Sequence, residues 1–201
     1  MWTRELLRID YYHLIAAFVV YSMLGWMVES IYMSFCNRKL TNRGFAKVPF
    51  CPIYGFGAVL GYLLLSPLRG NIITLFLVGA VLATVFEFLV GKLMLRLFGE
   101  LWWDYNDKPY NYKGIICLES TIAWGVYAII IVTFLHSRVI GFINRYERGI
   151  GMRVCGVILF IVIIDYMLRF KEIYQISWES QRKWMEDKYR NVKNFMDDYR
   201  R

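Results

Sequence analysis

Five long apolar runs, separated by shorter polar segments, dominate the 201-residue chain. They cover residues 11–35, 53–68, 71–98, 117–135 and 152–168. A helix crosses a bilayer with about 17 to 25 apolar residues, so four of the runs are long enough. The run at 53–68 is shorter, follows Pro49 and Pro52 and contains Pro67, so we expect it to be tilted, kinked or re-entrant. The pattern predicts an all-α, polytopic helical membrane protein with about five transmembrane helices.

The C-terminal segment 170–201 has no spanning run but carries an apolar seam at helical spacing. The seam consists of Trp178, Met185, Tyr189, Val192, Met196 and Tyr199. Successive members are seven, four, three, four and three residues apart. Its acidic and basic residues nearly balance, which favours docking on a partner or on a second copy of the chain over a polybasic lipid clamp. A solvated helix lying at the headgroups is the simpler alternative. The chain thus divides into a transmembrane domain, 1–169, and an amphipathic helical tail, 170–201.

Composition supports this assignment. Hydrophobic residues make up 58% and aromatic residues 18% of the chain, which is too apolar for a soluble domain of this size. The net charge of +8 comes from basic residues beside the apolar runs rather than in one patch, so we expect contact with the lipid bilayer and no nucleic-acid binding. The first run is too long for a signal-peptide core and lacks a small-residue cleavage site, so we expect it to remain in the mature chain.

Basic residues also predict an orientation. With five spans, seven of the 24 Lys and Arg residues lie on the N-terminal side and the other 17 on the opposite side. The positive-inside rule then predicts that the N-terminus lies outside and the tail in the cytoplasm, although four arginines from residue 137 to residue 153 oppose it. We expect the plasma membrane as the location of the chain. The four cysteines have no C-x-x-C spacing, and we expect free thiols with neither a metal site nor a cofactor.

The chain also resembles itself. Four pairs of residues match at an offset of 70: Arg43 and Lys113, Gly44 and Gly114, Gly55 and Gly125, and Ala58 and Ala128. Each unit would consist of a helix that contains a glutamate, a loop with a basic residue followed by glycine, and a second helix that begins with an aromatic residue followed by glycine. The sequence therefore indicates a tandem two-helix repeat with parallel copies and both loops on the cytoplasmic face, while two apolar hairpins can also match by chance.

Two glutamates lie inside predicted membrane helices. Placing a charged side chain at the centre of a membrane helix costs about 2.5 to 3.5 kcal/mol on insertion scales. Glu29 and Glu87 should therefore each face protein or water and have a partner. Arg43, Lys113 and hydroxyl side chains such as Ser120 are available partners. With Glu119, at the start of the fourth helix, the two glutamates would bind a cation, a cationic substrate or an exchangeable proton. The alternative is that they are packing residues that lock helices together.

Other chemistry has weaker support. The chain has no G-x-x-x-x-G-K-[ST] loop, no H-E-x-x-H and no G-x-S-x-G, so we expect no enzyme and assign no catalytic residue. His13 and His136 are single residues near the predicted outer boundary. Asp165 is expected to form an ordinary i,i+4 ion pair with Arg169. A membrane-embedded enzyme acting on lipid or peptide is a distant third reading.

Several ordered motifs between residues 11 and 135 resemble a known family. They are Gly25-Trp26-Met27-Val28-Glu29, Asn42-Arg43-Gly44-Phe45, Pro52-Ile53-Tyr54-Gly55-Phe56-Gly57-Ala58, Trp103-Asp104-Tyr105, Asn111, Gly114-Ile115-Ile116-Cys117-Leu118-Glu119-Ser120 and Trp124-Gly125. Together they resemble the bacterial putative ABC-transporter type IV membrane proteins, the CmpB-like family. Glu119 departs from the pattern, since we expect an apolar residue before Ser120.

The resemblance implies a transporter or permease-like membrane subunit. Since the chain has no nucleotide-binding loop, ATP hydrolysis would come from a separate nucleotide-binding subunit. The alternative is a non-transporting scaffold or accessory protein that recruits a partner, or forms a homo-oligomer, through its C-terminal helix. The candidate substrate- or ion-binding residues combine the three carboxylates with residues of the motifs: Glu29, Glu87, Glu119, Arg43, Asn42, Asn111, Trp26 and Tyr54.

Overall fold

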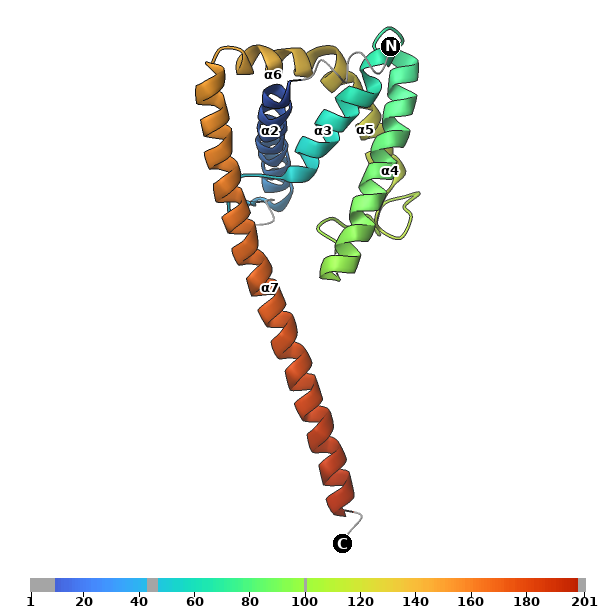
Figure 1. The fold of residues 1–201 in the computed structure, drawn as a ribbon. Coiled ribbons are helices and arrows are strands. Elements are labelled where there is room, and N and C mark those ends of the chain that lie inside the picture. The colour runs from blue at the N-terminus through green and yellow to red at the C-terminus, as the bar shows by residue number, and fades with distance from the viewer. Residues whose placement is uncertain (1–9, 43–46, 100, 199–201) are drawn as a thin grey trace.

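The fold is entirely helical over the part of the chain that the computed structural model describes, residues 10–42, 47–99 and 101–198. Figure 1 shows the elements. In chain order they are α2 (Tyr11–Asn37), α3 (Pro52–Leu65), the 3-10 turn η1 (Ser66–Leu68), α4 (Ile72–Phe98), α5 (Leu118–Ile130), the π-helical turn η2 (Ile131–Leu135), α6 (His136–Ile143) and α7 (Arg148–Asp198).

Four helical stretches in the described residues are long and apolar enough to cross a membrane. They are Tyr11–Asn37, Ile72–Phe98, Leu118–Ile143 and Arg148–Asp187, and the shorter apolar stretch Pro52–Leu68 lies between the first two. These stretches correspond to the five predicted runs. The predicted class, a polytopic helical membrane protein, is therefore confirmed, and the chain is a multi-pass membrane protein.

The helix ends follow from local sequence signals. Asp10 precedes α2 and accepts a hydrogen bond from the Tyr12 backbone N–H, and Asn71 does the same for Thr74 at the start of α4. Such side chains satisfy N–H groups that have no partner within the helix. Gly99 ends α4 in the left-handed conformation, with φ of 75°. These caps place the loops between helices where the hydrophobic pattern breaks.

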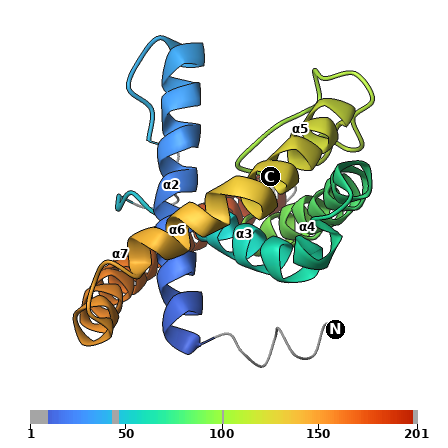
Figure 2. The same cartoon turned by 90° about the horizontal axis from the view of Figure 1, so that it is seen from above.

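The helices form two hairpins that run in the same direction. α2 and α3 form the first and α4 and α5 the second, with α2 and α4 starting at the same end of the molecule (Figure 1). At that end α6 turns aside and lies across α2 and α3, as Figure 2 shows from above. The turn follows η2, and π-helical turns are a known cause of helix kinks. Val139 and Ile143 of α6 are buried in the same core cluster as Tyr12 and Ala16 of α2.

The short second segment is explained by how the chain reaches α3. Phe50 is only 1% exposed, and the backbone N–H of Cys51 donates to the carbonyl of Ser22, near the middle of α2. The chain therefore runs back along α2 before helix formation starts at Pro52, where a missing N–H costs nothing. The segment is therefore a short helix preceded by a non-helical stretch whose last two residues, Phe50 and Cys51, are buried.

The last span and the tail form one helix. α7 has 51 residues, roughly 77 Å at 1.5 Å per residue, and it has no break at the predicted domain boundary between residues 169 and 170. Its first part packs against α2, and the rest extends away from the other helices (Figure 1). Trp178 and Tyr189 of the predicted seam are 71% and 75% exposed. Tyr199 lies outside the described residues.

Candidate functional site

Glu87 of α4 is a buried carboxylate held by three side chains. Only 5% of the residue is exposed. Tyr105 donates from its hydroxyl to Oε1 at 3.1 Å, while the Ser120 hydroxyl and the Trp124 indole donate to Oε2 at 3.2 and 3.0 Å. The donors come from the loop after α4 and from α5. This hairpin therefore closes around one carboxylate.

Glu29 of α2 has a similar partner in the first hairpin. The Tyr54 hydroxyl donates to Glu29 Oε2 at 2.7 Å, and Glu29 is only partly buried. The two helices approach closely here, because a Cβ atom on Gly25 would overlap the Tyr54 ring. A glycine at this position is what allows the phenol to lie along α2 and reach the carboxylate.

The two hairpins contain equivalent contacts, as the predicted repeat implies. In the first, Gly55 packs against Phe18, eleven residues before Glu29. In the second, Gly125 packs against Phe76, eleven residues before Glu87. In each hairpin the aromatic residue preceding the glycine, Tyr54 or Trp124, donates to the glutamate of the same hairpin.

These two aromatic donors also bring the hairpins together. The Tyr54 and Trp124 rings lie 6.5 Å apart, centroid to centroid, with an interplanar angle of 46°. Each ring is hydrogen-bonded to its own carboxylate, so a single aromatic contact connects the partners of Glu29 and Glu87. The arrangement therefore links the two carboxylates into one candidate site with two related halves.

Asn111 organises the loop that supplies Tyr105. Its side-chain amide donates to the carbonyls of Asn106 and Lys108 at 3.1 and 2.8 Å, and its oxygen accepts from the Gly114 N–H at 3.2 Å. Gly114 has a φ of 66°, and a Cβ atom there would overlap the Asn106 side chain. Asn111 thus supports the site through the loop rather than by touching a carboxylate.

The environment of Tyr105 keeps its phenol protonated, so that it remains a hydrogen-bond donor to Glu87. Burial raises the pKa of its phenol above the usual value near 10, and the charge of Glu87 raises it further. The phenol therefore stays protonated throughout the physiological range and keeps its hydrogen bond to Glu87.

Trp26 and Asn42 form a pair of their own. The Trp26 indole donates to Asn42 Oδ1 at 2.7 Å, and the Asn42 amide donates to the Lys47 carbonyl at 3.4 Å. This pair ties the end of α2 to the loop that leads to α3. Arg43, predicted as a cationic partner, lies outside the described residues.

Glu119 has different hydrogen-bond partners from Glu29 and Glu87. It is exposed, and it accepts a hydrogen bond from Lys108 Nζ at 2.8 Å, which raises the pKa of that lysine. Its neighbour Ser120 contacts Glu87, but Glu119 does not. The structure therefore brings Glu29, Glu87 and Tyr54 into one site and leaves Glu119 in a surface ion pair.

The predicted ion pair of Asp165 is wrong. Asp165 Oδ2 accepts the backbone N–H of Val48 at 2.8 Å, while Arg169 pairs with Glu172 at 3.0 Å. Sequence spacing suggested the helical neighbour, but the loop that returns along α2 has an N–H to satisfy at this position. A charged acceptor for a backbone N–H is a strong hydrogen bond.

Trp124, Tyr105 and Ser120 complete the shell of Glu87, although none is in the candidate set. The repeat contained the signal for Trp124, since it occupies the position of Tyr54 in the second copy. Tyr105 belongs to the motif Trp103-Asp104-Tyr105 and Ser120 was an available partner, but the sequence did not indicate that both would donate to Glu87, which depends on the fold of the loop. Among the described residues, no group of three or more His, Cys, Asp and Glu side chains is arranged to hold a metal ion.

Comparison with known families agrees with this architecture. The family model described as putative ABC-transporter type IV matches residues 16–170. The chain belongs to this family. The match covers both hairpins, α6 and the packed part of α7, and it stops where α7 leaves the other helices. No curated protein and no solved structure was found to match the chain.

Proposed function

We propose that this family member is a permease-like transporter subunit whose Glu29 and Glu87 form an intramembrane site for an exchangeable proton or cation. The observation that supports this most is the shell of Glu87. Among the described residues its hydrogen-bond donors are a phenol, a hydroxyl and an indole, all neutral. A carboxylate buried in an apolar helix without a cationic side chain is neutralised most readily by a bound proton or cation.

The repeat supports a transport role for this site. Carriers built from repeats commonly bind substrate between the repeated units, near the middle of the membrane. Here the Tyr54–Trp124 contact lies between the two hairpins and joins the partners of the two carboxylates. A shift of one hairpin against the other would change both shells together, which couples occupancy of the site to movement.

The source of energy and the orientation follow from the same proposal. The sequence contains no phosphate-binding loop, so a separate nucleotide-binding subunit would hydrolyse ATP, and the chain itself would be neither an enzyme nor a nucleic-acid-binding protein. In the plasma membrane, the two hairpin loops and the tail of α7 would face the cytoplasm and form the docking surface. Purification in mild detergent with mass spectrometry should recover an ATP-binding subunit in stoichiometric amounts. Recovery of the chain alone or as a homo-oligomer would contradict this part of the proposal.

The site itself is tested by proton flux in proteoliposomes. The purified chain, together with any ATP-binding subunit that co-purifies with it and with ATP supplied, is reconstituted in vesicles that enclose a fluorescent pH indicator, and a potassium diffusion potential drives protons inward. We expect Glu87→Gln and Glu29→Gln to abolish the flux. Glu119→Gln is the matched control, because Glu119 is exposed and contacts Lys108 instead, and it should retain the wild-type rate. Equal loss in all three variants, or no wild-type flux, would contradict the proposed carboxylate site.

A scaffold role is the second candidate. The exposed aromatic residues of α7, Trp178 and Tyr189, favour it, since large apolar side chains on an isolated helix commonly mark an interaction surface. On this reading the α7 tail recruits a partner or a second copy, and the glutamates only hold helices together. Glu87→Gln would then lower the melting temperature in detergent without removing any flux.

A further inference from the structure

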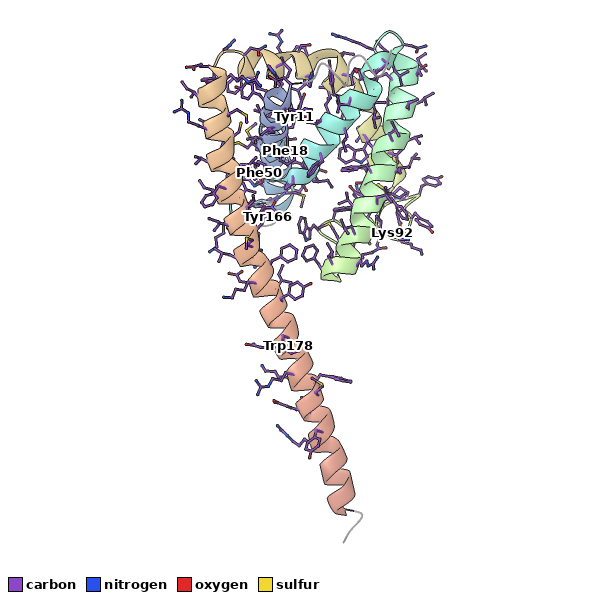
Figure 3. The ribbon with its side chains drawn as sticks, in the orientation of Figure 1. Tyr11, Phe18, Phe50, Lys92, Tyr166 and Trp178 are labelled. Atoms are coloured by element: carbon purple, nitrogen blue, oxygen red, sulfur yellow. The ribbon has the colours of Figure 1, made fainter. Side chains whose placement is uncertain are left out.

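Two adjacent residues of α7 hold the loop of the first hairpin. Asp165 Oδ2 accepts the backbone N–H of Val48 at 2.8 Å, and the Tyr166 hydroxyl donates to the backbone carbonyl of Phe50 at 3.1 Å. Figure 3 shows Phe50 and Tyr166 close together between α7 and α2, far from Trp178 on the protruding part of the helix. Both interactions join segments more than 110 residues apart in the chain.

The segment from Val48 to Cys51 needs such partners because it is non-helical and becomes buried along its length: Val48 is half-buried, and Phe50 and Cys51 are 1% and 4% exposed. Backbone groups at membrane depth must be satisfied by protein. Within this segment, the Phe50 N–H donates to the Val48 carbonyl at 2.8 Å and the Cys51 N–H to the Ser22 carbonyl at 3.1 Å. The remaining N–H of Val48 and carbonyl of Phe50 are satisfied by α7. The loop is therefore held between α2 on one side and α7 on the other.

This loop determines where the site residue Tyr54 lies. Helix α3 starts at Pro52, directly after the held segment, and Tyr54 follows two residues later with its hydroxyl 2.7 Å from Glu29. Displacement of the Val48–Cys51 backbone would displace the first turn of α3 and break this hydrogen bond. The contacts of Asp165 and Tyr166 thus act on Glu29 through the loop and Tyr54.

The second hairpin provides the comparison. There the indole of Trp103 donates to the carbonyl of Ile115 at 2.8 Å, just before α5 begins, and Trp103 belongs to the same loop. The second loop is held by its own residue, whereas the equivalent bond in the first hairpin comes from the last helix of the chain.

We infer that Asp165 and Tyr166 are positioning residues for the Glu29–Tyr54 half of the site, and that α7 sets this half from outside the hairpin. This inference rests on the proposed function for its consequence in transport. Since α7 is one continuous helix into its protruding part, a partner that tilts this part would move Asp165 and Tyr166 with it. In the Glu87 half the segment before α5 is held by Trp103 of its own loop, and α7 contacts this half through the Phe98 and Phe170 rings, 5.2 Å apart, at the end of α4.

The chain contains matched reporters for this inference. Cys51 and Cys117 are the N-cap residues of α3 and α5, and they are 4% and 3% exposed. Likewise, Glu29 and Glu87 are the carboxylates of the two hairpins. A small thiol reagent and a hydrophobic carbodiimide, each followed by peptide mass spectrometry, report on both pairs in the intact chain without any transport measurement.

The variants are Tyr166→Phe, which removes only the hydroxyl, and Asp165→Leu, with Asp165→Asn as the conservative variant that still accepts the Val48 N–H. We expect Tyr166→Phe and Asp165→Leu to raise the modification rates of Cys51 and Glu29 by about fivefold, the effect of one net hydrogen bond on a local opening. The rates of Cys117 and Glu87 should stay unchanged, and Asp165→Asn should remain near wild type.

Two results would overturn the inference: unchanged Cys51 and Glu29 rates in both variants, or equal increases in the two hairpins. These readouts are independent of flux, so loss of the proposed transport function would not be mistaken for failure of the positioning role.

Discussion

The two hairpins each place a glutamate beside hydrogen-bond donors, but they differ in which part of the chain holds the loop that positions those donors. The second surrounds Glu87 with three donors from its own loop and second helix. The first gives Glu29 the Tyr54 hydroxyl, and its loop depends on α7. The two hairpins share their core contacts, but the loop of the second is held by its own residue Trp103, whereas the loop of the first is held by hydrogen bonds from α7.

This difference indicates how a symmetric-looking pair could act asymmetrically. In the second hairpin, an ordered loop with Asn111 at its centre fixes Tyr105. In the first, the corresponding control lies in α7, which reaches far beyond the other helices (Figure 1). A displacement of the tail would therefore act on Glu29 through the first loop, and the Tyr54–Trp124 contact would connect this change to the partner of Glu87.

The largest expected effect separates the two equivalent glycines. A Cβ atom on Gly55 would overlap the Ser22 hydroxyl and both the ring and the backbone carbonyl of Phe18, whereas on Gly125 its three nearest neighbours would all be atoms of the Phe76 ring. Backbone cannot move aside without disturbing α2, but a ring can rotate. We expect Gly55→Ala to destabilise the fold by about 1 to 3 kcal/mol, the usual cost of overpacking. For Gly125→Ala, the strain of a shifted ring is of order 0.5 to 1.5 kcal/mol, and a helix-propensity gain near 0.5 to 1 kcal/mol offsets it.

Thermal unfolding in detergent measures this difference. Gly61→Ala is the control, because nothing lies within 4 Å of the position of its Cβ atom and the variant should gain slightly in stability. A larger loss of stability in Gly125→Ala than in Gly55→Ala would show that the two helix crossings do not differ as described.

A smaller effect distinguishes the carboxylate shells. Tyr54→Phe removes the hydroxyl that holds Glu29, while Trp124→Phe removes one of three donors to Glu87. A hydrogen bond to a charged group contributes about 1.5 to 3 kcal/mol, and remaining donors compensate in part for a lost one. We expect Tyr54→Phe to raise carbodiimide modification of Glu29. We expect Trp124→Phe to raise that of Glu87 only in part, since Tyr105 and Ser120 remain as donors. An unchanged modification rate of either glutamate would show that its aromatic donor does not hold it.

Much of the fold could be predicted from the sequence, because apolar runs and caps are local signals. The five segments and the helical tail follow from run length and spacing, and Pro49 and Pro52 pointed to the irregular second segment. The turn of α6 across the molecule could not be predicted, since it depends on a π-helical turn that no Pro or Gly pair announces. The continuity of α7 was also hidden, because its polarity changes at Arg169 while its helical geometry does not.

The site was predictable where it repeats and unpredictable where it depends on tertiary contacts. Glu29, Glu87 and Tyr54 follow from buried charge and from the matched motifs. Glu119 looked equivalent by position, yet a helix face directs it to Lys108 at the surface. The role of Asp165 required knowledge of a loop more than 110 residues away, which helical spacing alone cannot supply.

The smallest effect concerns that surface pair. Because the hydrogen bond to Glu119 raises the pKa of Lys108, the pair contributes to stability below the usual lysine pKa near 10.5 and loses this contribution as pH rises through the raised value. Both side chains are exposed, so salt should screen the interaction. We expect Glu119→Gln to lower the melting temperature slightly at pH 8 and low salt, with the difference vanishing in high salt or above the lysine pKa. A difference that persists under both conditions would place Glu119 among the residues that hold the hairpins together, contrary to its separation from Glu29 and Glu87.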